Sequence, residues 1–237
     1  VDPEIFSRAD LLAGHSVGEI AAGAAAGAFS AEAAMVLVRE RGRAMAETAS
    51  RTATSMTAVI GGDADEVLAA IEAAGLTPAN HNGKGQVVAA GTVEQLEAFA
   101  AKPPSRTRLF PLSVAGAFHT VHMEPAVDHL REVAAAMPTT TPSVALLSNL
   151  DGNVVTDGRE FANRLVNQVA HPVRWDLCMD TMVKRSVTGL LELAPAGTLT
   201  GIAKRNLKGV ELFNLNTPDQ IPAAREFVAA HSSKENA

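Results

Sequence analysis

The stretch Leu11-Leu12-Ala13-Gly14-His15-Ser16-Val17-Gly18-Glu19 is the part of the chain from which the fold can be worked out. A short apolar run stops at a serine flanked by glycines and continues into an alanine-rich segment, which predicts a strand, a sharp turn and a helix. The Gly-x-Ser-x-Gly spacing is typical of a nucleophile on a strained turn, where side chains at the glycine positions would collide with neighbouring backbone. We therefore predict Ser16 as the nucleophile and the Val17 amide, at the first turn of the helix, as an oxyanion donor. The alternative is a glycine-rich turn with an incidental serine.

The composition bounds the class of protein. The chain has 237 residues, 47% of them hydrophobic, with a formal net charge of −6, one Trp and no Tyr. No apolar run approaches the roughly 18 residues of a membrane span, and no secretory signal is visible. The single Cys178 cannot form an intrachain disulfide and fits buried packing in a reducing compartment. We expect a soluble cytoplasmic protein that binds neither membrane nor nucleic acid, because a basic surface and stacking aromatics are lacking.

A predicted helix over residues 31–49, with Ser30 as its N-cap, carries an unusual cation. Arg41 falls in the middle of an apolar helix face formed by Ala34, Leu37, Val38 and Met45. A guanidinium there keeps its charge and needs a partner, yet no acid shares that face within a turn. The partner is therefore either a bound anion or a distant Asp or Glu.

The rest of the chain predicts two units. Residues 52–114 are predicted to form strands and helices in the order βαββαβ, which indicates a ferredoxin-like insert. Asn80 and Asn82 would border the site where this insert covers it, or serve the adjacent turn. Residues 115–237 alternate helices and strands, which implies a parallel sheet covered on both faces and shared with residues 1–51. The tail from His231 to Ala237 is polar and expected to fray.

A serine nucleophile needs a base, and the chain has seven histidines. Position removes four of them: one lies within the turn, one in mid-helix, one before a proline and one in the tail. His81, His119 and His122 remain. His119 lies in a loop directly before a helix, a usual place for catalytic groups, but the pattern alone does not separate it from His122.

The motif Gly14-His15-Ser16-Val17-Gly18-Glu19 resembles the nucleophile motif of malonyl-CoA:acyl carrier protein transacylases and of the related acyltransferase domains of polyketide synthases. Three later stretches resemble the same family in the same order: Arg39-Glu40-Arg41-Gly42, Gly116-Ala117-Phe118-His119-Thr120 and Leu165-Val166-Asn167-Gln168. The resemblance implies an α/β-hydrolase-like domain, residues 1–51 and 115–237, with the ferredoxin-like subdomain inserted at 52–114.

The resemblance also implies a reaction. Ser16, deprotonated by His119, would take a malonyl group from malonyl-CoA and pass it to the phosphopantetheine thiol of acyl carrier protein, supplying fatty acid synthesis without metal or cofactor. Arg41 would bind the malonyl carboxylate, and a backbone carbonyl at Gln168 would orient His119. Met45 would line the pocket and Phe118 would exclude branched substrates, although both residues could equally be packing. The alternatives are a serine esterase or thioesterase, a trans-acting polyketide acyltransferase, or an inactive scaffold.

Three further expectations concern the ends, the partner and the assembly. Family members begin some tens of residues earlier, with a strand and a Gly-Gln-Gly loop that gives the second oxyanion donor, so we expect that N-terminal part to be missing here. The acidic carrier would dock on basic residues near the pocket mouth, and the protein is expected to be monomeric. The candidate docking residues are Lys184, Arg185, Lys204, Arg205 and Lys208.

Overall fold

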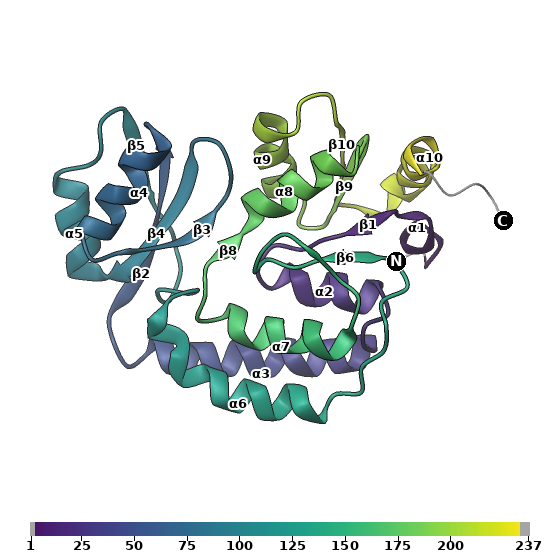
Figure 1. Ribbon diagram of the computed structural model, residues 1–237, viewed down its shortest axis with the longest axis horizontal. Coiled ribbons are helices and arrows are strands. Elements are labelled where there is room, and N and C mark those ends of the chain that lie inside the picture. Colours follow the sequence, from purple (N-terminus) through teal and green to yellow (C-terminus); the bar gives the residue numbers. More distant parts are fainter. Residues whose placement is uncertain (1–2, 233–237) are drawn as a thin grey trace.

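The computed structural model describes residues 3–232, which form an α/β fold with mixed sheets (Figure 1). The helices are α1 (Pro3–Arg8), α2 (Gly18–Ala25), α3 (Ala31–Ala49), α4 (Ala64–Ala73), α5 (Val93–Ala101), η1 (Val121–Met123), α6 (Glu124–Ala136), α7 (Gly158–Gln168), α8 (Trp175–Lys184), α9 (Thr198–Asn206), η2 (Pro218–Gln220) and α10 (Ile221–His231). The strands are β1 (Leu11–Leu12), β2 (Thr54–Gly61), β3 (Thr77–His81), β4 (Gln86–Thr92), β5 (Thr107–Pro111), β6 (Ala145–Leu147), β7 (Val154–Val155), β8 (Val173–Arg174), β9 (Gly189–Leu193) and β10 (Glu211–Leu215).

The segment between α3 and the loop at residue 116 forms its own sheet. Its strands are ordered β5-β2-β4-β3, all antiparallel, and α4 and α5 pack on one face through Val59, Ile71 and Phe99. The opposite face packs against Ala117 and Phe118. Strand β8, which lies far along the chain, adds to this sheet by pairing in parallel with β3. The sequence did not predict this fifth strand, because a two-residue strand carries no periodicity of its own.

The remaining strands differ from the single parallel sheet that the sequence predicts. They form a three-stranded sheet, β1-β6-β7, and a separate two-stranded sheet, β9-β10. The pairs β1-β6 and β9-β10 are parallel, but β7 is antiparallel to β6 because the turn at Gly152, with φ +69°, reverses the chain. Within residues 3–232, neither β1 nor β9 has a second strand beside it.

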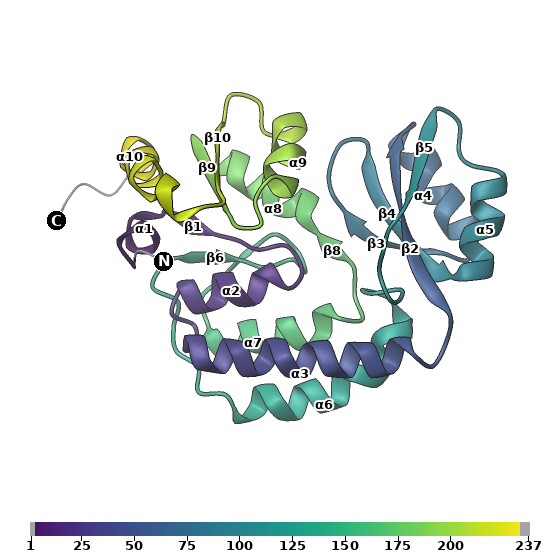
Figure 2. The same ribbon diagram turned by 180° about the vertical axis from the view of Figure 1, so that it is seen from behind.

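Both faces of the β1-β6 pair are nevertheless covered by helices, as expected. Leu146 belongs to the core formed with α2, α3, α6 and α7, whereas the next residue, Leu147, belongs to the core formed with α8 and α9. This follows from the alternation of side chains along a strand. Figure 2 shows α3 and α6 lying side by side below α2, so α2 lies between β1 and the long helix that carries Arg41.

The two ends of the described chain lie together. Helix α1, which the sequence did not predict, contacts α10, and the Ser232 hydroxyl donates to the Arg8 carbonyl at 2.7 Å. His231, expected in a frayed tail, is instead the last residue of α10, while positions 233–237 of that tail lie outside the described residues. Among the helices of residues 3–232, none is both long and apolar enough to cross a membrane.

Candidate active site

The predicted strand, sharp turn and helix form the first wall of the site. Ser16 has a φ of 54°, a strained conformation for a residue with a side chain, and it lies between β1 and α2. A Cβ on Gly14 would lie 2.0 Å from the backbone carbon of Gly18, so only glycine fits at position 14. The same argument is wrong for Gly18, because a Cβ there would meet nothing within 4 Å. Of the two glycines in the motif, only Gly14 is therefore required for steric reasons.

His119 lies against Ser16. Its Nδ1 is 2.8 Å from the Gln168 carbonyl oxygen, and because a carbonyl only accepts, Nδ1 carries the proton. Nε2 is then the acceptor for the Ser16 hydroxyl, 2.7 Å away. Burial lowers the pKa of His119 to about 3, partly opposed by the Gln168 hydrogen bond, while the charge of Arg41 lowers it further. The imidazole is therefore neutral and able to accept a proton at neutral pH.

Arg41 approaches the same hydroxyl from α3. Its side chain is on the buried face, as predicted, and Nη2 donates to Ser16 Oγ at 3.0 Å and to Gln168 Oε1 at 3.3 Å. Burial lowers the pKa of Arg41 to about 10, and nearby Glu19 opposes this shift, so the guanidinium remains charged at neutral pH. The buried Nε has no partner within residues 3–232. The guanidinium therefore lies beside the nucleophile with one of its donors unsatisfied by the described residues.

Two polar residues without a role in the sequence prediction complete the site. Asn149, which is fully buried, accepts from the Ser16 amide at 2.8 Å and donates to the Gly14 carbonyl at 2.8 Å, so it ties both ends of the turn. Glu19, 1% exposed, accepts from the Asn149 amide at 2.9 Å and from the side chain of Gln168. Glu19 belongs to the motif, but Asn149 gave no signal, because a lone Asn after a strand usually serves a turn.

The other predicted site residues take different places. Val17 is the N-cap residue of α2, so its N–H precedes the intrahelical bonds and is one of the donors that a helix start leaves available. Met45 is buried among the helices of the α2-α3-α6-α7 core. Phe118 packs partly buried between this core and the small sheet. Asn82 Oδ1 accepts from Nε2 of the half-buried His15 at 2.9 Å, which joins the small sheet to the turn.

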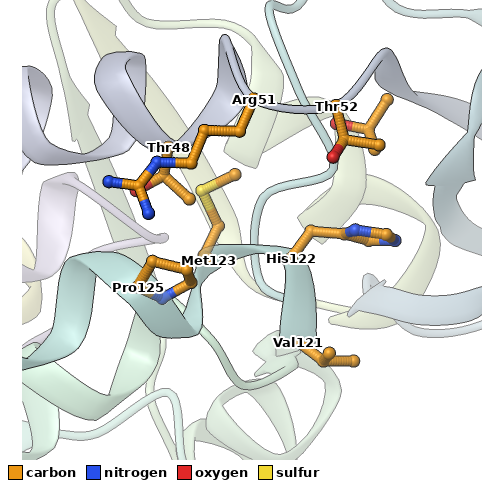
Figure 3. Close-up of a pocket in the computed structure, with 8 residues that line it drawn as sticks. Thr48, Arg51, Thr52, Val121, His122, Met123 and Pro125 are labelled. Carbon is orange, nitrogen blue, oxygen red and sulfur yellow. The ribbon is translucent and has the colours of Figure 1, made fainter.

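One of the two histidines that the sequence left as alternative bases lies elsewhere. His122 lines a separate cavity of about 210 Å³ between the end of α3 and the start of α6 (Figure 3). Neither Ser16 nor Arg41 lines that cavity. The other lining residues are Thr48, Arg51, Thr52, Thr54, Val121, Met123 and Pro125. No group of three or more His, Cys, Asp or Glu side chains able to hold a metal occurs in the part of the chain that the structure describes.

Comparison with known proteins agrees with this geometry. The family model described as "Acyl transferase domain" matches residues 7–226. The malonyl CoA-acyl carrier protein transacylase of Mycobacterium tuberculosis is 48% identical over 208 residues, 88% of this chain and 69% of that protein. Its counterpart in Escherichia coli is 34% identical over 223 residues, 92% of this chain and 72% of that protein.

Solved structures give the same result. A crystal structure of MCAT from Mycobacterium tuberculosis superimposes with a TM-score of 0.89 at 46% identity, covering 93% of this chain and 73% of that one. A malonyl-transacylase in complex with its type II polyketide acyl-carrier protein gives a TM-score of 0.84 at 31% identity, covering 92% and 72%. This chain belongs to the acyl transferase domain family, among the malonyl-CoA:acyl carrier protein transacylases.

Proposed function

We propose that this protein transfers a malonyl group from malonyl-CoA to the phosphopantetheine thiol of an acyl carrier protein, and so supplies extender units for fatty acid synthesis. One observation carries the proposal: the Ser16 hydroxyl lies 2.7 Å from a neutral imidazole and 3.0 Å from a buried guanidinium. The first group can activate a nucleophile, and the second can hold an acyl group that bears its own carboxylate.

The first half-reaction loads the enzyme. His119 Nε2 takes the hydroxyl proton as Ser16 Oγ attacks the thioester carbonyl, and the Val17 amide donates to the developing oxyanion. The C–S bond then breaks, and the imidazolium returns the proton to the sulfur of coenzyme A. The second half-reaction repeats these steps with the carrier thiol as nucleophile, which forms the new thioester and restores the serine hydroxyl.

Arg41 selects the acyl group in this mechanism. Its guanidinium lies 3.0 Å from the nucleophile and would bind the malonyl carboxylate. Burial is the main cause of the low pKa of His119 and the charge of Arg41 is a lesser one, which a bound carboxylate would offset. Met45 would line the acyl pocket, and Phe118 would leave no space for a branched acyl group.

We propose that carrier docking involves basic residues on α8 and α9 and just after them. All five predicted residues are exposed, and α9 lies against the hairpin that follows β3, where the Lys84 amide donates to Asn206. An acidic carrier would be attracted to this edge despite the net negative charge of the protein. The five residues are Lys184, Arg185, Lys204, Arg205 and Lys208.

We also propose the division into residues 1–51 with 115–237 as an α/β-hydrolase-like domain and 52–114 as a ferredoxin-like subdomain. The strand order β5-β2-β4-β3 with two helices on one face supports the second assignment. We propose that the protein is a monomer. We also propose that it is cytoplasmic, since the unpaired thiol of Cys178 suits a reducing compartment.

The test is loading of the intact protein. Ser16→Ala is expected to abolish the malonyl adduct that malonyl-CoA forms on the wild-type protein, measured by intact mass, while Ser50→Ala, an exposed serine at the end of α3, retains it. Transfer is then measured with and without carrier protein. Carrier-independent hydrolysis would identify an esterase or thioesterase instead, and an adduct that survives Ser16→Ala would refute the nucleophile.

A further inference from the structure

A buried acid lies behind the nucleophile and has no part in the reaction steps above. Glu19 is 1% exposed, one turn after Ser16 on α2, and it makes no ion pair within the described residues 3–232. Its two carboxylate oxygens accept from different groups. Oε1 accepts from the backbone N–H of Asn149 at 2.9 Å, and Oε2 accepts from Gln168 Nε2. Buried acids are rarely retained without such partners, so the contacts define what this one does.

The Gln168 side chain links Glu19 to Arg41. Its Nε2 faces three acceptors, which are Glu19, the Ser16 carbonyl at 3.2 Å and Asn149 Oδ1 at 3.3 Å. Its Oε1 faces Arg41 Nη2 at 3.3 Å. An ionised carboxylate can only accept hydrogen bonds. Glu19 therefore disfavours the flipped orientation of the Gln168 amide, in which Gln168 Oε1 would face the carboxylate. All three acceptors favour the orientation that presents an oxygen to Arg41, and Glu19 is the only one of them that can carry a charge.

We infer that Glu19 is a positioning residue, which holds Arg41 in the geometry needed for the substrate carboxylate by fixing the Gln168 amide between them. The inference rests on the proposed function, because it concerns how the malonyl group is bound. Glu19 also anchors Asn149, which ties Gly14 to Ser16, so one carboxylate sets the nucleophile and the carboxylate-binding cation relative to each other.

The decisive change is Glu19→Gln, which keeps the shape of the side chain and removes one acceptor. A glutamine oxygen can serve the Asn149 amide, but its NH2 group then faces Gln168 Nε2. The Gln168 amide then loses its charged acceptor and keeps only the two longer contacts, to the Ser16 carbonyl and Asn149 Oδ1, so its Oε1 is held less firmly against Arg41. Since a hydrogen bond to a charged group contributes more than a neutral one, malonyl loading should fall about tenfold while acetyl loading changes little.

Stability is measured in parallel with a matched control. Glu19→Gln removes a buried charge as well as a hydrogen bond, and these opposing effects should leave the melting temperature within a few degrees of wild type. Glu192 is a second buried Glu that accepts from the Gly197, Leu199 and Thr200 amides, remote from Ser16. Glu192→Gln should lower the melting temperature more and leave the ratio of malonyl to acetyl loading unchanged.

The pH dependence gives an independent readout. Burial raises the pKa of Glu19 to about 7, partly opposed by its hydrogen bonds from Asn149 and Gln168. The carboxylate is therefore lost as the pH falls through 7, and the malonyl-to-acetyl ratio of the wild-type protein should fall between pH 8 and pH 6. In Glu19→Gln this ratio should not change with pH. The titratable or charged groups around Glu19 are Arg41 from α3, Arg164 from α7, His171 after α7 and Cys178 from α8.

The outcomes separate this inference from the proposed function. A wild-type protein that forms no malonyl adduct would overturn both. A wild-type protein that loads malonate, together with a Glu19→Gln variant of unchanged ratio and unchanged pH profile, would overturn the inference alone. Should Glu19→Gln fail to fold, Gln168→Met breaks the same link from the other side, and it must also lose malonyl loading selectively or the inference is wrong.

Discussion

Replacing Arg41 by Ala tests the acyl specificity of this protein most directly. Arg41 is 8% exposed, and within residues 3–232 its guanidinium donates only to neutral partners, Ser16 Oγ and Gln168 Oε1. A substrate carboxylate on it forms a desolvated charge pair, whose loss costs about 3 kcal/mol. Because each 1.36 kcal/mol changes a rate about tenfold, malonyl loading should fall about a hundredfold in Arg41→Ala. Acetyl loading, which involves no carboxylate, should fall far less.

The same structure predicts the effect on folding. Deleting Arg41 leaves Gln168 Oε1 without its donor, a cost of about 1–3 kcal/mol, but among the described residues it leaves no acid of an ion pair unpaired. A fall of a few degrees in melting temperature is therefore expected. Arg159→Ala is a suitable control, because that guanidinium donates to the carbonyls of Ala134 and Met137 and is remote from Ser16.

The assay is single-turnover loading, followed by intact mass, with malonyl-CoA and acetyl-CoA in parallel and calorimetry on each variant. The expected result is a selective malonyl defect in Arg41→Ala and none in Arg159→Ala. An equal loss of both acyl groups, together with a large fall in melting temperature, would refute the reasoning and make Arg41 a structural residue.

Three further changes have definite expectations. Gly14→Ala should abolish loading and lower the melting temperature, because its Cβ would lie 2.0 Å from backbone, whereas Gly18→Ala should be tolerated; similar losses in the two variants would contradict this. Since burial lowers the pKa of His119 to about 3, the rate of acetyl loading should not fall near pH 6.5. The stability due to the neutral imidazole should decline as the pH falls from about 6.5 towards 3. A fall in the loading rate with an apparent pKa near 6.5 would argue against His119 as the base. Lys204→Glu should raise the KM for carrier protein without slowing loading from malonyl-CoA, whereas Lys102→Glu, directly after α5, should change neither; an equal effect on both half-reactions would exclude Lys204 from docking.

Much of the site could be predicted because its signals are local. The spacing around Ser16 predicts a sharp turn, and the helical period alone places Arg41 on a buried face. The structure has both features. The choice between His119 and His122 could not be made from the sequence, because the two lie three positions apart in the same loop region and only the tertiary fold decides which imidazole meets Ser16.

The features that escaped prediction depend on contacts between distant segments. Asn149 lies more than a hundred positions from Ser16, and its role exists only because β6 pairs with β1. Strand β8 joins the small sheet through two residues, which is too short for a pattern. The need for glycine at position 18 was inferred from the motif, but that requirement depends on the local packing, which leaves space there.

The burial of the single cysteine has a practical consequence for measurement. Cys178 is fully buried beneath β6, its thiol donates to the Ser148 carbonyl at 3.4 Å, and burial raises its pKa well above the usual value. Thiolates, not thiols, react with disulfide reagents, so the folded protein should be silent towards such a reagent. Loading without carrier protein frees one coenzyme A thiol for each malonyl group placed on Ser16, whereas complete transfer to the carrier consumes one thiol for each thiol it frees. A colour change with a chromogenic disulfide therefore reports the loading step when no carrier is present, and reactivity of the protein itself reports unfolding.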